Sequence, residues 1–462
     1  MMGEPFHFDV SASAEGTGTR FVVSADGATR SYALPGGEQG DYAIFQEALA
    51  RDWGTRAAHG HPNPPPAAPD AARWEPLLTA PHDPRATAGF GDPAVLRTNR
   101  GHVLVATSND APDAFPVLRS DDLSRWTHLG FVFPEGRTPA WTLAGRNKAD
   151  FWAPEMARVG KEFWLVYTAR GTDGVLAIGL AKAGNPKGPW TDLGRPLLRG
   201  RRVSLPSISA DPITVGVIDS HLFVDEDGPI LFWKEDTNGL WPRPLATLLR
   251  EKPELIPALF ESERDRRTAA FAAAVVAHAN TRRPIERFFL MQPLIGAVLG
   301  RWAHVRRVLG ETREAAHIVA ALRTPVFAQR LSPDGTGLVG ERVEVLANDR
   351  GWEGHLIEGP WVTEQNGRYW LFYAGNDFCT PSYGIGVAVA DSPWGPYVKQ
   401  PEPLLKSTAE WWAPGHASVA PGRDGKPRLF FHAFHPGTGG YNAFRALLTV
   451  GLRFGADGVE LV

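Results

Sequence analysis

Three acidic residues hold the same position in a repeated strand pattern, although they lie far apart along the chain. Asp92 precedes the apolar stretch of GDPAVLR, Asp219 that of DSHLFVDEDG, and Glu358 that of EGPWVTE. Hydrolysis of a glycosidic bond needs one carboxylic acid to protonate the leaving oxygen and one carboxylate to activate water or attack the sugar. A third carboxylate beside the acid would keep the acid protonated near neutral pH by like-charge repulsion. These residue types therefore predict glycoside hydrolysis.

Each acid also has a purely structural interpretation. An Asp before Pro is a common turn starter, so Asp92 could simply cap a turn. Asp83, Asp211 and Asp391 have similar surroundings and no claim to catalysis. Asp83 and Asp211 lie outside the repeated position, whereas the three candidate acids share it. The shared position favours a catalytic set.

The strand pattern occurs five times, each time as an apolar strand, a polar turn and a second apolar strand. The five openings are GDPAVLR, WAPEMARV, DSHLFVDEDG, EGPWVTE and GHASVAPG. Their partner strands are GHVLVATSN, KEFWLVYTAR, GPILFWKED, GRYWLFYAG and KPRLFFHAF. Period-two alternation across turns such as DEDG is typical of antiparallel hairpins. Three of these units continue to a third strand and then an aromatic residue that starts an outer strand: Trp126, Trp190 and Tyr397. The pattern predicts an all-β, five-bladed β-propeller.

Blade three contains a long interruption at about residues 243–323, between FWKEDTN and TPVFAQRLSPDG. Helical spacing of apolar residues, with Pro253 and Pro284 as helix starters, predicts three or four helices. The insertion joins a second strand to a third, so strand direction predicts that it emerges where the inner strands begin. It would then wall the pocket mouth and restrict access to chain ends or short oligosaccharides. The alternative is that its apolar faces form a subunit interface or pack on the propeller's flank.

The first part of the chain lies outside the repeat. Alternation over Phe6–Leu34 predicts a few strands, and Tyr42–Trp53 reads as a helix. The proline-rich residues 59–72 predict an extended connector. The expected domains are therefore a β-rich extension with its connector at 1–72, and a propeller at 73–462 that carries the insertion.

Composition limits the function classes. The 462 residues are 43% hydrophobic and 21% charged, with a formal charge of −3, which is typical of a soluble globular protein and does not suggest a nucleic-acid partner. The single cysteine, Cys379, excludes an intramolecular disulfide. The longest apolar run, FFLMQPLIGAVLG, is interrupted and too short to span a bilayer. The opening MMGEPFHFDV shows no secretory signal, so the expected location is cytoplasmic or unassigned, and the oligomeric state stays open.

From about Phe90 to Val462 the chain resembles glycoside hydrolase family 43, the five-bladed β-propeller enzymes that include arabinofuranosidases, xylosidases, galactofuranosidases and arabinanases. GFGDPAV resembles the family's general-base motif, with Asp92 as the base. VIDSHLFVDEDG resembles its pKa-modulator motif with Asp219, and IEGPWVTEQNGRYWLFYAG its general-acid motif with Glu358. Ser220 stands where the family usually has Pro, and the helical insertion is a larger departure.

The resemblance also nominates binding residues. FWAPEM resembles the segment whose aromatic residues line the sugar pocket, which implies Phe151 and Trp152. PGHASV implies an axial histidine, His416, and the closing segment implies that Arg445 reaches the sugar. In some relatives such a histidine helps to hold a metal, so a structural calcium bound through water is one expectation for His416 and a simple hydrogen-bonding role is the other. No cofactor is expected to be required.

Family members invert configuration, so the resemblance implies that Asp92 deprotonates water while Glu358 protonates the leaving oxygen. That geometry places the two carboxyl groups about 6.5–9.5 Å apart. We expect an exo-acting α-L-arabinofuranosidase on oligosaccharides or polysaccharide side chains, with β-xylosidase or galactofuranosidase as alternatives. Two other classes stay open: a non-catalytic carbohydrate-binding propeller, and a glycoside phosphorylase, for which Arg445 is the one strong basic candidate.

Overall fold

The computed structural model describes residues 6–37, 39–57, 74–83, 89–109, 111–143, 149–203, 213–237, 239–441 and 443–462. The chain divides into two compact units. Met1–Pro62, Ser204–Ile213 and Thr237–Arg323 form the first, and Asn63–Val203, Thr214–Asp236 and Thr324–Val462 form the second. The predicted connector at 59–72 and Asp211 lie outside the described residues.

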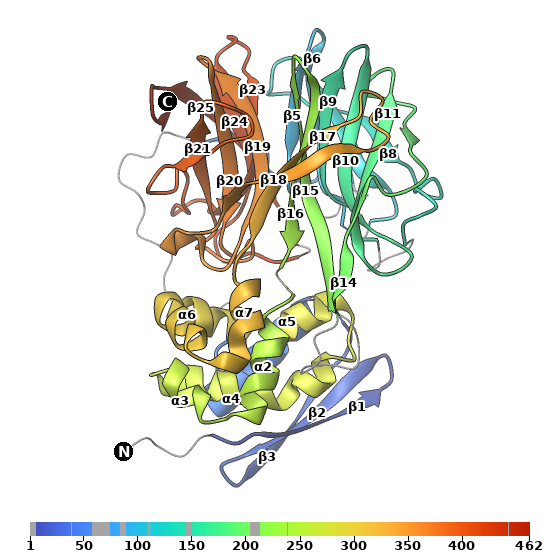
Figure 1. Ribbon diagram of the computed structural model, residues 1–462. Coiled ribbons are helices and arrows are strands. Elements are labelled where there is room, and N and C mark those ends of the chain that lie inside the picture. The colour runs from blue at the N-terminus through green and yellow to red at the C-terminus, as the bar shows by residue number, and fades with distance from the viewer. Residues whose placement is uncertain are drawn as a thin grey trace. The chain divides into compact units, whose positions relative to one another are not determined.

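The second unit contains, within its described residues, five sheets of four or five strands (Figure 1). The first sheet consists of β5 (Ala94–Thr98), β6 (Gly101–Val105), β7 (Ala114–Ser120) and β8 (Thr127–Phe133). The second consists of β9 (Trp152–Val159), β10 (Glu162–Arg170), β11 (Leu176–Ala183), β12 (Thr191–Asp192) and β13 (Leu198–Arg199). The third is β14 (Arg201–Val203), β15 (Ile213–Asp225), β16 (Gly228–Asp236), β17 (Pro325–Leu331), β18 (Leu338–Ala347). The fourth consists of β19 (Ile357–Gln365), β20 (Arg368–Gly375), β21 (Gly384–Ala390) and β22 (Val398–Lys399). The fifth includes β23 (Trp412–Pro421), β24 (Pro427–Phe434), β25 (Ala446–Phe454) and β26 (Val459–Leu461).

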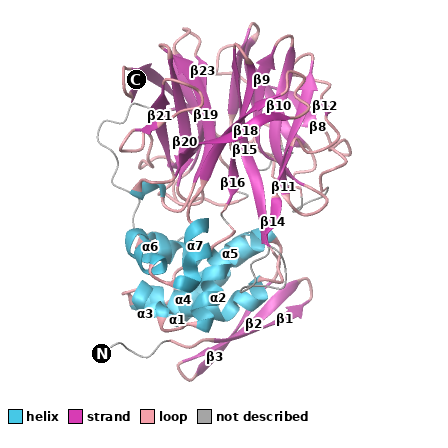
Figure 2. Ribbon diagram, in the orientation of Figure 1, coloured by secondary structure: helices cyan, strands magenta, loops and turns pink. Residues whose placement is uncertain are grey.

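The strands of these five sheets are magenta in Figure 2, and contacts between neighbouring sheets close them into a ring of blades. Strand β5 contacts β9 and β23, and β19 contacts β16 and β23. Blades two and three are joined by the backbone N–H of Asp219, which donates to Thr168 Oγ1 at 3.2 Å. Strand β4 (Glu75–Leu78), the first of this unit, pairs with β25 of the last blade. The unit is a β-propeller, as the sequence predicts.

Apolar side chains fill the space between neighbouring blades. One cluster joins blades one and two and includes Phe115, Phe151 and Tyr167. Both faces of these strands are buried, which explains why apolar residues outnumber polar ones in the partner strands. The aromatic residues predicted to start the outer strands directly precede β8, β12 and β22: Trp126, Trp190 and Tyr397.

The inner strands share a backbone irregularity that the sequence pattern does not predict. Strands β9, β15, β19 and β23 each have a register shift against their partners. Across the five blades, a residue near this position has a positive φ: Asp92 (52°), Ala153 (42°), Asp219 (55°), Gly359 (57°) and His416 (49°). Such bulges bend a strand and re-aim its side chains. Asp219 consequently lies inside β15, which begins at Ile213, rather than at a strand start as its sequence pattern suggests.

The first unit combines the amino-terminal segment with the helical insertion. Its sheet is β1 (Asp9–Glu15), β2 (Gly18–Ala25) and β3 (Ala28–Leu34). Its helices in the described residues are α1 (Gln39–Trp53), α2 (Pro242–Glu251), α3 (Leu255–Leu259), α4 (Glu263–Ala279), α5 (Pro284–Leu299), α6 (Trp302–Gly310) and α7 (Ala316–Ala321). Six helices thus lie in the insertion where the sequence predicts three or four, because α3 and α7 are too short to show a helical period.

The sequence assigns these two segments to different domains, whereas the structure packs them together. Phe45 of α1 stacks on Phe21 of β2 with ring centroids 4.7 Å apart, and also contacts Phe271 of α4. A buried ion pair joins Arg56 to Asp265. The shared aromatic core makes one compact unit from segments that are about two hundred residues apart.

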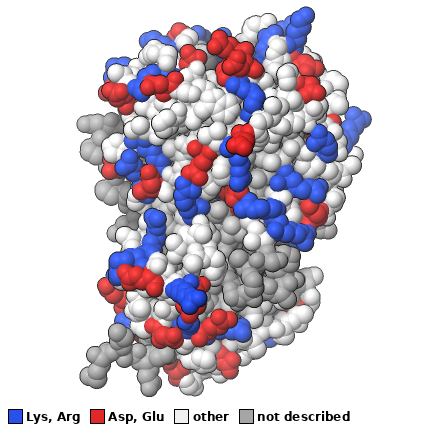
Figure 3. Space-filling model, in the orientation of Figure 1, with Lys and Arg blue, Asp and Glu red and all other residues white. Residues whose placement is uncertain are grey.

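Charged side chains of both signs are spread over the face that Figure 3 shows. There, the described Lys and Arg side chains are interspersed with Asp and Glu. None of the described helices is long and apolar enough to cross a membrane.

Candidate active site

Asp92 lies two residues before β5 and is held by residues from blades one and five. Arg445 Nη1 donates to Asp92 Oδ1 at 2.9 Å, and the hydroxyl of Thr107 donates to Oδ2. Burial is the largest influence on the pKa of Asp92 and raises it, but Arg445, two histidines and the Thr107 hydrogen bond together outweigh burial and hold this pKa well below its usual range. His416 and His432 act in the same direction as Arg445. Asp92 is therefore an anion at neutral pH.

Asp219 is a buried carboxyl group in contact with blade four. Its Oδ2 accepts a 3.0 Å hydrogen bond from the backbone N–H of Gly359, the residue after Glu358. Burial raises the pKa of Asp219 to about 6, and the negative charges of Glu358 and Asp92 act in the same direction. Asp219 is therefore electrostatically coupled to both other acids, which the sequence pattern alone could only suggest.

Glu358 accepts hydrogen bonds from one residue of blade three and one residue of its own blade. Lys234 Nζ, from β16, lies 3.2 Å from Glu358 Oε2. The hydroxyl of Tyr383, from the loop before β21, donates to Oε1 at 2.6 Å. Burial raises the pKa of Tyr383 well above its usual value, and Glu358 adds to this shift, so the phenol stays neutral and acts as a donor.

Two glycines let these side chains approach the backbone. A Cβ on Gly91 would lie 1.8 Å from Arg445 Cζ, and a Cβ on Gly415 would lie 1.8 Å from Tyr383 Cε1. Any larger residue would displace the guanidinium from Asp92 or the phenol from the Glu358 side. The glycines of GFGDPAV and PGHASV thus have a packing reason in this site.

Comparison with known proteins gives the family. The sequence profile described as "Glycosyl hydrolases family 43" matches residues 84–247 and 317–459, well over half of the chain. The chain belongs to glycosyl hydrolase family 43. Both matched ranges lie around the three acids, and the gap between them falls inside the helical insertion.

Curated relatives match shorter stretches of this family 43 chain. A β-D-galactofuranosidase of Aspergillus niger is 33% identical over 90 residues, which cover 19% of this chain and 25% of the relative. An arabinoxylan arabinofuranohydrolase of Bacillus subtilis is 31% identical over 156 residues, which cover 30% of this chain and 28% of the relative. The chain spans about a quarter of the length of these relatives.

A solved structure supports the fold of this family 43 chain. The crystal structure of a thermostable family-43 glycoside hydrolase has a TM-score of 0.55 and 24% identity, and the match covers 81% of this chain and 92% of that one. At this identity the likeness shows the propeller fold and does not identify a substrate.

The two aromatic residues of FWAPEM have different surroundings in this family 43 chain. Phe151 is 1% exposed and packs edge-on against Phe115, with ring centroids 5.5 Å apart. The prediction that Phe151 lines the sugar pocket is therefore corrected, since its ring belongs to the core between blades. Trp152 is half-buried, contacts Tyr441 edge-on at 6.2 Å, and its Nε1 has no hydrogen-bond partner among the described residues. Its role as a sugar contact stays a prediction.

His416 and Arg445 both face Asp92. His416 Nδ1 lies 3.5 Å from Asp92 Oδ1, so the predicted axial histidine does lie at the candidate base. Arg445 binds this carboxylate, and its Nε has no partner among the described residues. Calcium prefers several oxygen ligands. The described chain has no group of three or more His, Cys, Asp or Glu side chains that could hold a metal directly, and a calcium bound through water at His416 stays a prediction.

Four residues that bind or face the acids have no role predicted from the sequence: Thr107, Lys234, Tyr383 and His432. One signal was present for Lys234, because a lysine that follows Phe232 and Trp233 in an apolar strand must find an anionic partner when buried. The other three come from strands or loops with no distinctive pattern. Thr107 and Tyr383 each contact the acid of their own blade, whereas His432 reaches Asp92 from blade five.

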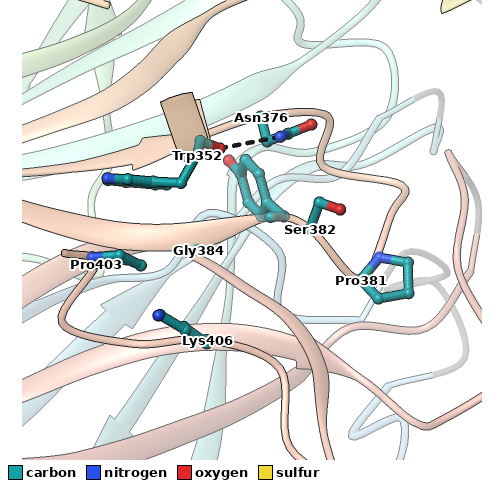
Figure 4. A pocket seen from close by; sticks show the side chains of 8 residues that line it. Trp352, Asn376, Pro381, Ser382, Gly384, Pro403 and Lys406 are labelled. Atoms are coloured by element: carbon teal, nitrogen blue, oxygen red, sulfur yellow. Dashed lines mark hydrogen bonds between the residues drawn. The ribbon is translucent and has the colours of Figure 1, made fainter. Parts of the chain in front are cut away.

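A cavity of about 330 Å³ lies beside Tyr383 (Figure 4). Its lining residues are Trp352, Asn376, Pro381, Ser382, Tyr383, Gly384, Pro403 and Lys406. Asn376 Nδ2 donates to the backbone oxygen of Trp352 at 3.0 Å, which fixes one wall of the cavity. An aromatic ring together with a few polar groups is the usual lining of small-ligand pockets. Tyr383 links this cavity to Glu358.

Proposed function

We propose that the protein is an inverting glycoside hydrolase in which Asp92 is the general base, Glu358 the general acid and Asp219 the residue that keeps the acid protonated. The observation that carries this proposal is the different environment of the three carboxyl groups. Arg445 and the neighbouring His416, His432 and Thr107 hold Asp92 as an anion, whereas Asp219, whose pKa burial raises to about 6, lies buried beside Glu358 and as a carboxylate repels negative charge there. Carboxyl groups with opposed proton affinities are the arrangement that acid–base catalysis needs.

The reaction follows from these roles. A water molecule attacks the anomeric carbon and gives one proton to Asp92, while the bond from that carbon to the leaving oxygen breaks. Glu358 donates its proton to the leaving oxygen and becomes an anion, which Lys234 and Tyr383 are placed to stabilise. Proton exchange with solvent then restores both residues. Attack and departure on opposite faces invert the configuration without a covalent sugar intermediate.

Membership of family 43 does not determine which sugar is cleaved, so the sugar is part of this proposal. We take an α-L-arabinofuranoside as the substrate, released from the end of an oligosaccharide or a polysaccharide side chain, as in hemicellulose. The relatives include an arabinoxylan arabinofuranohydrolase, which favours this choice, and a β-D-galactofuranosidase, which keeps a galactofuranoside as an alternative beside a β-xyloside. The cavity beside Tyr383 would receive the leaving part, because it lies on the acid's side.

Two measurements test the proposal. A panel of 4-nitrophenyl furanosides and pyranosides in phosphate-free buffer should give release of free sugar from the arabinofuranoside first. Proton NMR during turnover should show the inverted anomer before mutarotation. Binding without cleavage of any substrate would favour a carbohydrate-binding propeller, and cleavage that requires added phosphate would favour a phosphorylase.

A further inference from the structure

Lys234 is a buried cation beside the proposed acid, and the reaction assigns it no proton transfer. Its side chain is fully buried and its Nζ lies 3.2 Å from Glu358 Oε2. Burial lowers the pKa of Lys234, but Glu358, Asp219 and Asp236 raise it above its usual value, so the side chain is an ammonium. Burying such a charge costs free energy unless carboxylates pair with it. The ammonium of Lys234 therefore acts on the charge of the Glu358 carboxyl group.

A comparable cluster in blade four shows what a structural lysine looks like in this protein. Lys399 Nζ lies 2.6 Å from Glu353 Oε1, to which the hydroxyl of Tyr373 also donates at 2.8 Å. The other oxygen of Glu353 accepts hydrogen bonds from the backbone N–H groups of Asp349 and Arg350. This carboxylate thus accepts hydrogen bonds at both oxygens and is completely buried.

Glu358 has the same kinds of partner but fewer of them. Within the described residues, its carboxyl group receives hydrogen bonds from Lys234 and Tyr383 and none from the backbone. Its 8% exposure also exceeds that of Glu353, which is 0%. The carboxyl group of Glu358 therefore has fewer fixed partners and is open to a further one, whereas Glu353 serves to hold blade four together.

We propose that Lys234 sets how readily Glu358 releases its proton, as a positioning residue that opposes Asp219. This inference rests on the proposed role of Glu358 as the acid. The ammonium favours the carboxylate that forms when the leaving oxygen takes the proton, whereas the charge of Asp219 disfavours it. Lys234 thereby makes the acid stronger, and it also makes the resting acid ionise at a lower pH.

The charged groups around this pair come from several elements. Burial raises the pKa of Asp377, from the loop after β20, to about 6, and Glu358 adds to this shift. Burial lowers the pKa of His355, before β19, to about 3, and Lys234 adds to this shift, so the imidazole is neutral. The remaining groups that face the pair are Asp219 on β15, Asp236 on β16 and the neutral phenol of Tyr383. Lys234 is thus the one cation among the described groups that contacts the carboxyl of Glu358.

The test compares Lys234→Met with the unchanged protein over a range of pH. With an alkyl glycoside, whose leaving group needs a proton, the alkaline limb of kcat/KM should move up by about 1–3 pH units, the usual effect of one nearby opposite charge. The kcat below that limb should fall, because the acid is weaker. With a 2,4-dinitrophenyl glycoside, which leaves without a proton, neither protein should show this limb. Lys234→Arg, which keeps the charge, should stay close to the unchanged profile.

Lys399→Met is the matched control. It removes a buried lysine from a similar Lys, Glu and Tyr cluster, so it should lower the melting temperature without moving the alkaline limb. If Lys234→Met does not fold, Lys234→Gln removes the charge but keeps a donor and carries the same expectation. A folded variant with an unmoved limb overturns the inference. Absence of hydrolysis by the unchanged protein on every glycoside would instead overturn the proposed function.

Discussion

The backbone N–H of Gly359 donates a 3.0 Å hydrogen bond to Oδ2 of Asp219. This bond ties the residue next to Glu358 to a carboxyl group from another blade. Rotation of Asp219 or a shift between blades three and four would therefore change the surroundings of the proposed acid. The bond makes the position of Asp219 relative to Glu358 a property of the tertiary structure.

Asp92→Asn and Glu358→Gln should each lower kcat by about 10²–10⁴-fold, the usual contribution of a general base or acid. Circular dichroism and the melting temperature should show that both variants remain folded. Glu358→Gln should keep most of its activity on a 2,4-dinitrophenyl glycoside, because that leaving group needs no proton. Near-normal activity of either variant on an alkyl glycoside would contradict its assigned role.

Asp219→Asn should move the alkaline limb of kcat/KM to lower pH. Above about pH 6, the pKa to which burial and nearby acids raise Asp219, its carboxylate opposes ionisation of Glu358. Removal of this charge lets Glu358 lose its proton earlier, so the limb should fall by on the order of one pH unit. Asp391→Asn, at an exposed acid paired with Arg368, is the control and should leave the profile unchanged. An unshifted limb in Asp219→Asn would mean that Asp219 only supports the bulge.

Gly91→Ala should reduce activity by roughly 10²-fold, the effect of a displacement of about 1 Å at a reacting group. The new Cβ would lie 1.8 Å from Arg445 Cζ, so the guanidinium must leave its place beside Asp92. Gly184→Ala is a matched control, because a Cβ there meets nothing within 4 Å. Equal kinetics of the two variants would show that the Arg445 contact does not matter for turnover.

To test whether the insertion restricts substrate length, the amino-terminal segment must be deleted together with the insertion. Phe21 and Phe45 share an aromatic core with Phe271, so removal of the insertion alone would expose the amino-terminal segment. We therefore expect a stable protein only when residues 1–62 are removed and residues 237–323 are replaced by a short Gly-containing turn. That protein should cleave polymer more readily relative to oligosaccharide. An unchanged ratio of the two kcat/KM values would show that the insertion does not select substrate length.

The repeat itself could be predicted because hairpins are local. Period-two alternation and turn residues lie within about twenty residues of one another, so five blades and the shared positions of Asp92, Asp219 and Glu358 are visible in the chain. The same reasoning found the strands before Leu34 and the helix that ends at Trp53. It also found the helical character of the insertion.

The alternation of buried and exposed residues does not predict the faces of side chains where a bulge interrupts a strand. The positive φ of Ala153 accompanies a register shift in β9, so alternation along the rest of β9 does not show that Phe151, and not Trp152, faces the core. The same kind of bulge puts Asp219 inside a strand. A bulge changes which face a side chain takes without changing residue composition.

Contacts between distant segments were decided only by the tertiary structure. Lys234 lies 124 residues from Glu358, and Arg445 lies 353 residues from Asp92, so neither pairing has a local signature. The packing of the amino-terminal segment against the insertion likewise has no local signature in the sequence. The sequence by itself determined which hairpins form and which acids they carry, because those depend on neighbours along the chain. The partners from other blades that set the charge state of the acids, such as Arg445 and Lys234, were decided by the closure of the propeller, which brings the blades together.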